Sequence, residues 1–174
     1  LARLRMPDMY SLFCARPDQL VPRDLVFGVK ERVLADGQVQ APLEREAIAA
    51  AIKALQAKGA EGVIVSFLHA YRNPAHEKEA RALIEELAPE MFVFCASEVW
   101  PVIREYERTT TALLNGYVHR RVAGYLESLT AALRERHVPA RPMLTKSNGG
   151  LMTAETGKRS CVNTPFSIST GAPL

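Results

Sequence analysis

The sequence lacks the features that mark several common classes of protein. It has only three cysteines, Cys14, Cys95 and Cys161, an odd number without C-x-x-C spacing. This pattern argues against both a disulfide framework and a zinc ribbon. We interpret all three as structural or tolerated thiols, because a buried cysteine behaves as a small hydrophobic residue.

Long apolar runs and strong charge of one sign are also missing. The longest apolar stretches, such as residues 62–68, are far shorter than the roughly 20 residues of a membrane helix, and no apolar leader follows Arg3 and Arg5. A net charge of +3 from 22 basic and 19 acidic residues leaves no basic stripe for nucleic acid. The sequence predicts a soluble, cytoplasmic protein with neither a nucleic-acid nor a membrane partner.

The first part of the chain predicts an α/β fold. The 174 residues are 48% hydrophobic, enough to bury a sizeable core. The expected elements are a hairpin over residues 26–39 with a turn at Asp36-Gly37, helices over 43–58 and 74–87, and buried strands over 63–68 and 91–95. Strand, helix and strand in this order imply a right-handed βαβ crossover. We therefore expect a mixed or partly parallel sheet with flanking helices.

The second part predicts mostly helix. Apolar residues at three- and four-residue steps over residues 101–137 favour two helices in line, broken near Asn115-Gly116. A short strand over 143–145, a tight loop over 147–150 and a helical turn from 153 follow. The expected division is an extended lead-in over residues 1–24, an α/β subdomain over 25–100, and a helical segment with a strand, a loop and an irregular tail over 101–174.

A dense polar cluster opens the long helical stretch. Arg104, Glu105, Glu107 and Arg108 alternate in sign before three hydroxyl residues that begin at Thr109. One interpretation is a solvated first turn with local ion pairs. The other is a site, because three β-branched hydroxyl residues are poor helix formers and suit a place where an oxygen has something to bind. We expect Glu105 and Arg108 to have defined partners, either because they belong to a buried structural network or because they line a substrate cleft.

Two further features are candidates for chemistry. His69 ends a predicted strand, where open α/β sheets place ligands. It is therefore a candidate acid, base or metal ligand, and the alternative is an ordinary structural histidine. The loop Ser147-Asn148-Gly149-Gly150 offers backbone N–H groups to an anion, or is a plain turn. His76 is expected to face solvent or pack within its helix, and His119 and His137 suit helix ends. No metal site is predicted.

Taken together, several stretches resemble the hydantoinase A / 5-oxoprolinase family, in the family's order. They are residues 63–77, 97–99, 104–111, 114–118 and 147–150, with weaker likeness at 20–23 and 31–37. The resemblance implies part of an actin-like ATPase fold. It also implies an enzyme that uses ATP and Mg²⁺ to phosphorylate a cyclic imide or amide oxygen, or a ketone enolate, before hydrolysis or carboxylation.

The chain also departs from that family. Family members are several times longer and begin with an acidic-residue-Gly-Gly-Thr phosphate loop, which does not occur here. We therefore expect an internal fragment, a truncated reading frame or one piece of a split enzyme, with no nucleotide cofactor held by this chain alone. Its expected partners are the remaining part of the enzyme or a second subunit, and a small cyclic amide. The alternative is a non-catalytic α/β binding or assembly module.

Overall fold

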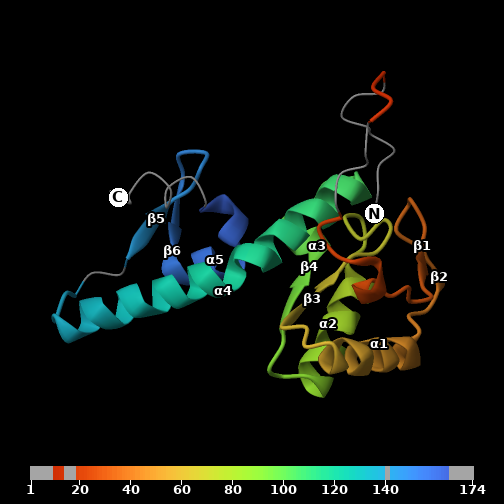
Figure 1. The fold of residues 1–174 in the computed structure, drawn as a ribbon, viewed down its shortest axis with the longest axis horizontal. Helices are drawn as coiled ribbons and strands as arrows, with labels where there is room; N and C mark the ends of the chain where they lie inside the picture. The colour runs from red at the N-terminus through yellow and green to blue at the C-terminus, as the bar shows by residue number, and fades with distance from the viewer. Residues whose placement is uncertain (1–9, 14–18, 140–141, 165–174) are drawn as a thin grey trace.

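The computed structural model describes residues 10–13, 19–139 and 142–164. It has two lobes joined by one long helix, α4 (Figure 1). The first lobe contains η1 (Arg23–Leu25), β1 (Arg32–Val33), β2 (Val39–Ala41), α1 (Arg45–Ala57), β3 (Gly62–Val65), α2 (Ala75–Leu87), β4 (Phe92–Cys95) and α3 (Ala96–Val99). After α4 (Glu105–Glu135), the second lobe contains β5 (Met143–Thr145), β6 (Leu151–Thr153), α5 (Ala154–Arg159) and η2 (Cys161–Asn163).

The first lobe is built on a parallel pair of strands. β3 and β4 pair in parallel from Gly62 opposite Phe92 to Val65 opposite Cys95. Helices α1 and α2 pack on this pair and on each other, and their buried residues form one core. That core contains Leu43, Ile48, Ile52, Leu55, Val65, Ala80, Ile84, Ala88 and Met91. The predicted helices, strands and parallel pairing are confirmed, as is the α/β class.

The strands form three separate two-stranded sheets, of which β3–β4 is parallel and the other two are antiparallel. The predicted first hairpin is shorter than expected. It turns at Gly37, whose φ of +94° suits glycine, and Gly37 N–H donates to the Leu34 carbonyl at 2.9 Å. Residues 26–31 form no part of β1, although the Lys30 carbonyl accepts the Glu44 N–H across the hairpin.

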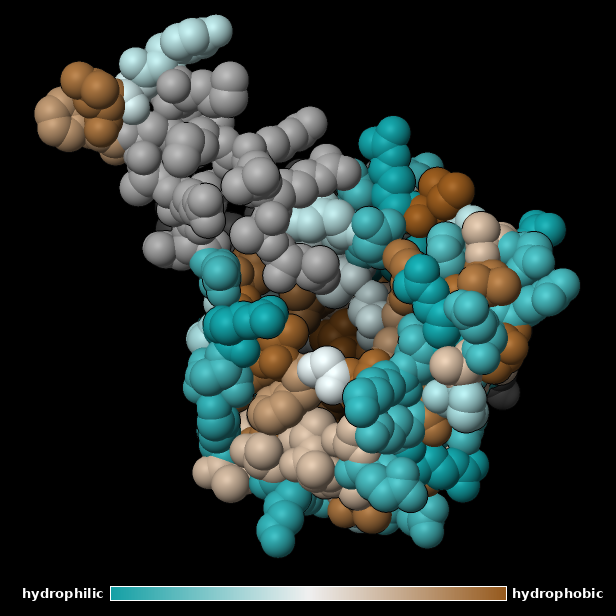
Figure 2. Space-filling model, turned by 90° about the vertical axis from the view of Figure 1, so that its right-hand side faces the viewer, coloured by the Kyte–Doolittle hydropathy of each residue, from teal (hydrophilic) through white to brown (hydrophobic). Residues whose placement is uncertain are grey.

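Figure 2 views the side of the first lobe that carries β1 and β2, and shows it hollowed at its centre. Hydrophobic atoms lie in the hollow, with hydrophilic residues on much of the rim. The segment on this side includes exposed apolar side chains at Val26, Phe27 and Val39. Within the described residues, no helix is both long and apolar enough to cross a membrane.

Helix α4 is a single helix of 31 residues, so the expected break near Asn115-Gly116 is wrong. Both residues are buried in its middle. A Cβ on Gly116 would come within 3.0 Å of Ile64 Cδ1, so glycine allows β3 to approach the helix closely. The roughly 1 kcal/mol that glycine costs a helix is offset here by the packing of β3 and β4 on α4.

The end of α4 and the second lobe follow the sequence more closely. His137 has φ +55° just beyond the helix, and Val138 N–H donates to the Leu133 carbonyl, so His137 belongs to the helix end as expected. His119 lies in mid-helix, which corrects that part of the expectation. β5 and β6 form a hairpin, and Thr153 caps α5 by accepting the Thr156 N–H at 3.2 Å.

The division at residues 24 and 100 stays a prediction. Residues 1–9 and 14–18 of the predicted lead-in and residues 165–174 of the predicted irregular tail lie outside the described residues, as does Cys14. The two described cysteines, Cys95 and Cys161, are free and buried. Burial raises the pKa of each thiol to about 11. Both thiols are therefore poor nucleophiles near neutral pH.

Candidate functional site

The carboxyl ends of β3 and β4 bring three of the predicted site residues to one edge. His69 lies in the turn after β3 with φ +58°, and its carbonyl accepts the N–H groups of Arg72 and Asn73. Its half-buried ring lies 6.3 Å from that of Tyr71. The Tyr71 ring in turn lies under the Arg108 guanidinium, 5.9 Å from it. Chain segments that are far apart in sequence thus meet at this edge.

Glu77 is the acidic centre of this edge and is fully buried. Its Oε1 accepts the Phe67 N–H at 3.0 Å. Its Oε2 accepts both the backbone N–H and the hydroxyl of Ser97, at 2.9 and 2.6 Å. One carboxylate therefore joins α2 to the turn after β3 and to the first turn of α3. Three hydrogen bonds to the charged form compensate for its burial.

Arg108 is the basic centre and is also fully buried. Its Nη1 donates to the Val102 carbonyl at 2.7 Å and its Nη2 to the Phe67 carbonyl at 2.8 Å, while its Nε has no partner among the described residues. The expectation that Arg108 has defined partners is confirmed, and none of its hydrogen bonds to a described residue goes to an acid of its own cluster. Its hydrogen-bond partners are backbone carbonyls, because its side chain points into the lobe rather than along the helix surface.

The other two predicted residues of the cluster differ in placement. Thr109 is buried, and its Oγ1 lies 2.5 Å from Ser66 Oγ and donates to the Glu105 carbonyl at 2.7 Å. The Glu105 side chain is exposed. Of the local ion pairs considered for this cluster, the structure shows Arg104 Nη1 with Glu107 Oε1, at a distance of 3.9 Å. The structure thus brings His69, Arg108 and Thr109 together and leaves the Glu105 side chain outside.

The Ser147–Gly150 loop lies in the other lobe, as the turn between β5 and β6. Ser147 N–H donates to the Asn163 carbonyl, Gly149 N–H to Lys146, and Gly150 N–H to the Asn148 side chain. Three of its four backbone donors are therefore engaged within the chain. Anion binding by this loop stays a prediction, and only the Asn148 N–H is left to offer.

Several residues of these networks were missed in the sequence. Glu77 and Ser97 were given no role, although Glu77 shares the inner face of α2 with Ala80 and Ile84. That helical phase was the signal that could have found it. His76 was expected to face solvent or pack within its helix; instead it is buried, with Nδ1 2.8 Å from Glu31 Oε2 in the segment before β1.

Asn115 is a buried polar residue of α4 that binds the main chain of the second lobe, as Arg108 binds that of the first. It is fully buried, its Nδ2 donates to the Arg159 carbonyl at 3.1 Å, and its Oδ1 accepts the Val162 N–H at 2.9 Å. His119, one turn further on, has Nδ1 3.0 Å from the Lys158 carbonyl. These contacts attach α5 and η2 to α4. No periodic pattern distinguishes such a residue from a helix breaker.

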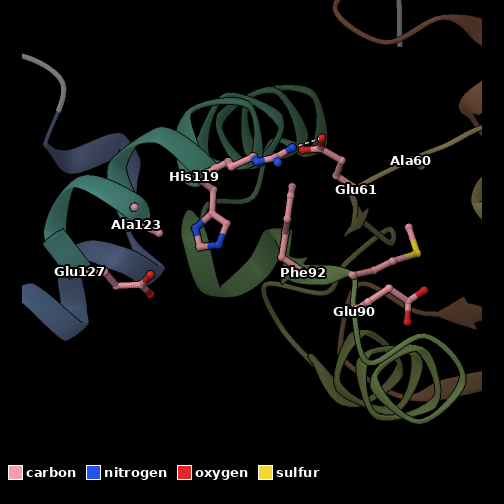
Figure 3. A pocket seen from close by; sticks show the side chains of 10 residues that line it. Ala60, Glu61, Glu90, Phe92, His119, Ala123 and Glu127 are labelled. Atoms are coloured by element: carbon pink, nitrogen blue, oxygen red, sulfur yellow. Dashed lines mark hydrogen bonds and ion pairs between the residues drawn. The ribbon is translucent and has the colours of Figure 1, made fainter.

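An open pocket of about 740 Å³ lies between the first lobe and helix α4, at the other end of β3 and β4 (Figure 3). Its walls come from the starts of the two strands and from the middle of α4. Arg120 of α4 pairs with Glu61 across it, and the His119 ring lies 4.9 Å from that of Phe92. None of the predicted site residues lines this pocket.

The groups at the β3–β4 edge do not fit a metal–nucleotide site. The buried acid and base are bonded to the main chain and to Ser97, and within the described residues no three His, Cys, Asp or Glu side chains are grouped to hold a metal ion. The arrangement is suited to fixing the path of the chain where two strands and two helices meet.

This fold occurs in solved ATP-using enzymes. The structure matches the crystal structure of the ATP-dependent caprolactamase from Pseudomonas jessenii with a TM-score of 0.76 and 34% identity, over 83% of this chain and 21% of that one. It matches nucleotide-free acetone carboxylase with a TM-score of 0.75 and 29% identity, over 86% of this chain and 22% of that one. The class is therefore the α/β fold that these two enzymes share.

The sequence defines the family. Residues 1–88 match the model of the hydantoinase/oxoprolinase N-terminal region, and residues 108–168 match that of hydantoinase/oxoprolinase. The chain belongs to the hydantoinase/oxoprolinase family. It is 35% identical to caprolactamase subunit alpha of Pseudomonas jessenii, over 88% of this chain. It spans about a fifth (22%) of the length of that relative.

Proposed function

We propose that the chain is a segment of an ATP-dependent amidohydrolase of the hydantoinase/5-oxoprolinase type, acting on a cyclic imide or amide, and that it is inactive alone. The observation that carries this proposal is the ordered match to both family regions, together with the likeness to a caprolactamase, an enzyme named for a cyclic amide. The complete enzyme would activate the amide oxygen with ATP and Mg²⁺ supplied by parts outside this chain.

In that enzyme, this segment would keep the turn after β3 in a fixed position. Glu77 and Arg108 fix the turn after β3 from its two sides, and this turn presents His69 at the edge of the sheet. A half-buried imidazole on a fixed backbone is suited to donate or accept a proton at a bound amide. His69 is therefore the residue of this chain that we assign to the substrate side, with Arg108 and Thr109 as supports.

The test is an assay of the complete enzyme, with ATP and Mg²⁺, against hydantoin, 5-oxoproline and caprolactam, and against acetone with bicarbonate. Phosphate release stimulated by a cyclic amide supports the proposal. Stimulation by acetone and bicarbonate alone assigns the chain to a carboxylase, a candidate favoured by its likeness to acetone carboxylase. The chain by itself should hydrolyse no ATP, and Mg²⁺-dependent turnover by the purified chain would contradict that part.

A non-catalytic binding or assembly module is the second candidate. It is favoured by the closed hydrogen-bonding of the Glu77–Arg108 network, which leaves few polar groups for a ligand. His69→Ala separates the two in the complete enzyme. Under the catalytic proposal, cyclic-amide turnover falls and the thermal melt is unchanged. Full turnover with His69→Ala would leave the segment with a purely structural role.

A further inference from the structure

Helix α4 has apolar side chains on two opposite faces. One face is buried against both lobes and includes Ala112, Val122 and Leu126. On the other face Leu114, Tyr117 and Tyr125 are 44%, 84% and 56% exposed. A group of exposed apolar side chains on one face of a helix is typical of a surface that another part of a protein covers. This second face therefore needs an explanation that the described part of the chain does not supply.

The exposed residues form a continuous line. Positions 114, 117, 121 and 125 fall within about 80° of one another around the helix axis and extend along about 16 Å of it, at 100° and 1.5 Å per residue. We call Leu114, Tyr117, Arg121 and Tyr125 the outer stripe of α4. Tyrosine and arginine are the residue types that most often dominate protein interfaces. The stripe thus has the composition of an interface rather than of a solvated helix face.

The charge on the stripe indicates what covers it. Arg121 is its only charged member and is exposed, and it makes no hydrogen bond or ion pair with any other described residue. Neighbouring Arg120, by contrast, is paired with Glu61 of the first lobe. The stripe therefore fits an apolar surface that carries a carboxylate.

The length of related proteins indicates where that surface comes from. The chain spans 21–22% of the caprolactamase and acetone carboxylase chains that share its fold. Most of a protein of this family would thus lie outside residues 1–174. We propose that the outer stripe of α4 is the surface on which the remainder of the longer enzyme packs, through an apolar patch with a carboxylate opposite Arg121. This inference rests on the proposed function, since it takes the chain to be a segment of that enzyme.

The test compares two charge reversals on the same helix. Arg121→Glu lies in the stripe, and Arg134→Glu, also at an exposed position, lies outside it. The chain and the remainder of the enzyme are produced as two pieces, and their association is measured by titration. We expect Arg121→Glu and Tyr117→Glu to weaken association by at least about tenfold, as at an interface hot spot. Arg134→Glu and Tyr117→Phe should bind like the unaltered chain.

The same variants are melted as the chain alone, where the three at Tyr117 and Arg121 should behave like the unaltered chain because their side chains are exposed. Arg134→Glu reverses a cation in the last turn of α4 and should cost at most about 1 kcal/mol. Association that tolerates Tyr117→Glu and Arg121→Glu as well as Arg134→Glu overturns the proposal. Concentration-dependent dimers of the chain, abolished by Tyr117→Glu, also overturn it, because a second copy would then be the occupant. Failure of the proposed function is distinguished by the substrate assay, since an assembled but inactive enzyme would still show the binding difference.

Discussion

Glu77 and Arg108 hold the two sides of a single residue, Phe67. The carboxylate accepts the Phe67 N–H at 3.0 Å, and the guanidinium donates to the Phe67 carbonyl at 2.8 Å. Both side chains are fully buried. The two opposite charges therefore bind the N–H and the carbonyl of one residue, and among the described residues they form no direct ion pair with each other. Each gains partners in the main chain, whose position does not depend on a flexible side chain.

Arg108→Ala should destabilise the chain by a few kcal/mol. It leaves the Phe67 and Val102 carbonyls buried without their donor, and a buried unsatisfied group costs about 1–3 kcal/mol. It also removes the guanidinium that lies over the Tyr71 ring. Arg104→Ala is the control, because that side chain is 74% exposed and its pair with Glu107 is long. Urea unfolding measures both, and equal stability of the two variants would contradict a structural role for Arg108.

Glu77→Gln should lower the free energy of unfolding by about 1–3 kcal/mol, although glutamine has the same shape as glutamate. The amide has one oxygen, so its NH₂ group must face either the Phe67 N–H or the Ser97 N–H, both of which are donors. Glu79→Gln removes a carboxylate that pairs with Arg45 at the surface and should cost less than about 1 kcal/mol. Thermal melts of the two variants at one pH check the difference, and a Glu77→Gln melt that matches Glu79→Gln would refute it.

Gly62→Ala and Gly124→Ala should have opposite effects. A Cβ on Gly62 would overlap the ring of its cross-strand neighbour Phe92, whereas Gly124 has open space around the position of a Cβ. Overpacking costs about 1–3 kcal/mol, and alanine in place of glycine in a helix contributes up to about 1 kcal/mol of stability. Chemical denaturation should show the two shifts with opposite sign. A stabilising Gly62→Ala would mean that Phe92 has room to move.

Asn115→Ala should loosen the second lobe without unfolding the first. The variant loses both bonds that hold α5 and η2 to α4, namely those to the Arg159 carbonyl and the Val162 N–H. Amide hydrogen exchange should accelerate over residues 159–164 and stay slow in β3 and β4. Uniform acceleration across both lobes would show that they unfold as one unit.

The buried thiols should make stability fall at alkaline pH. Folding raises the pKa of Cys95 from 9.0 to about 11, so the folded chain holds the proton more tightly than the unfolded chain. The contribution of the buried Cys95 thiol to the free energy of unfolding is therefore complete below about pH 9 and is lost as the pH rises through about 11. Urea melts across this range should show a smaller loss in Cys95→Ala. An identical pH profile in that variant would contradict the assigned burial effect.

The sequence predicted the fold well where the apolar residues of a helix or strand recur with the period of that element. Helices α1 and α2 and the strands β3 and β4 lie within a few residues of their expected positions, because the apolar residues of each follow its inner face. The parallel pairing followed from the order of these elements alone. The resemblance to the hydantoinase/oxoprolinase family, carried by short motifs, is likewise confirmed.

The sequence was misleading where a residue serves two elements. Asn115-Gly116 reads as a helix break, yet both residues are buried where the lobes pack on α4. Arg108 reads as part of a local charge cluster, yet its partners include the Phe67 carbonyl, 41 residues away. Contacts of this kind depend on the folded arrangement and leave no periodic signal. The site assignments for His69 and for the Ser147–Gly150 loop stay predictions.

The bonding of Arg108 also bears on how sequences of this family can be recombined. Its two acceptors are main-chain carbonyls, at Phe67 and Val102, so the contact does not depend on which side chains occupy those positions. The matched regions, residues 1–88 and 108–168, meet through this contact. A chimera that takes the first region from one relative and the second from another would keep the junction intact as long as the turn after β3 follows the same path.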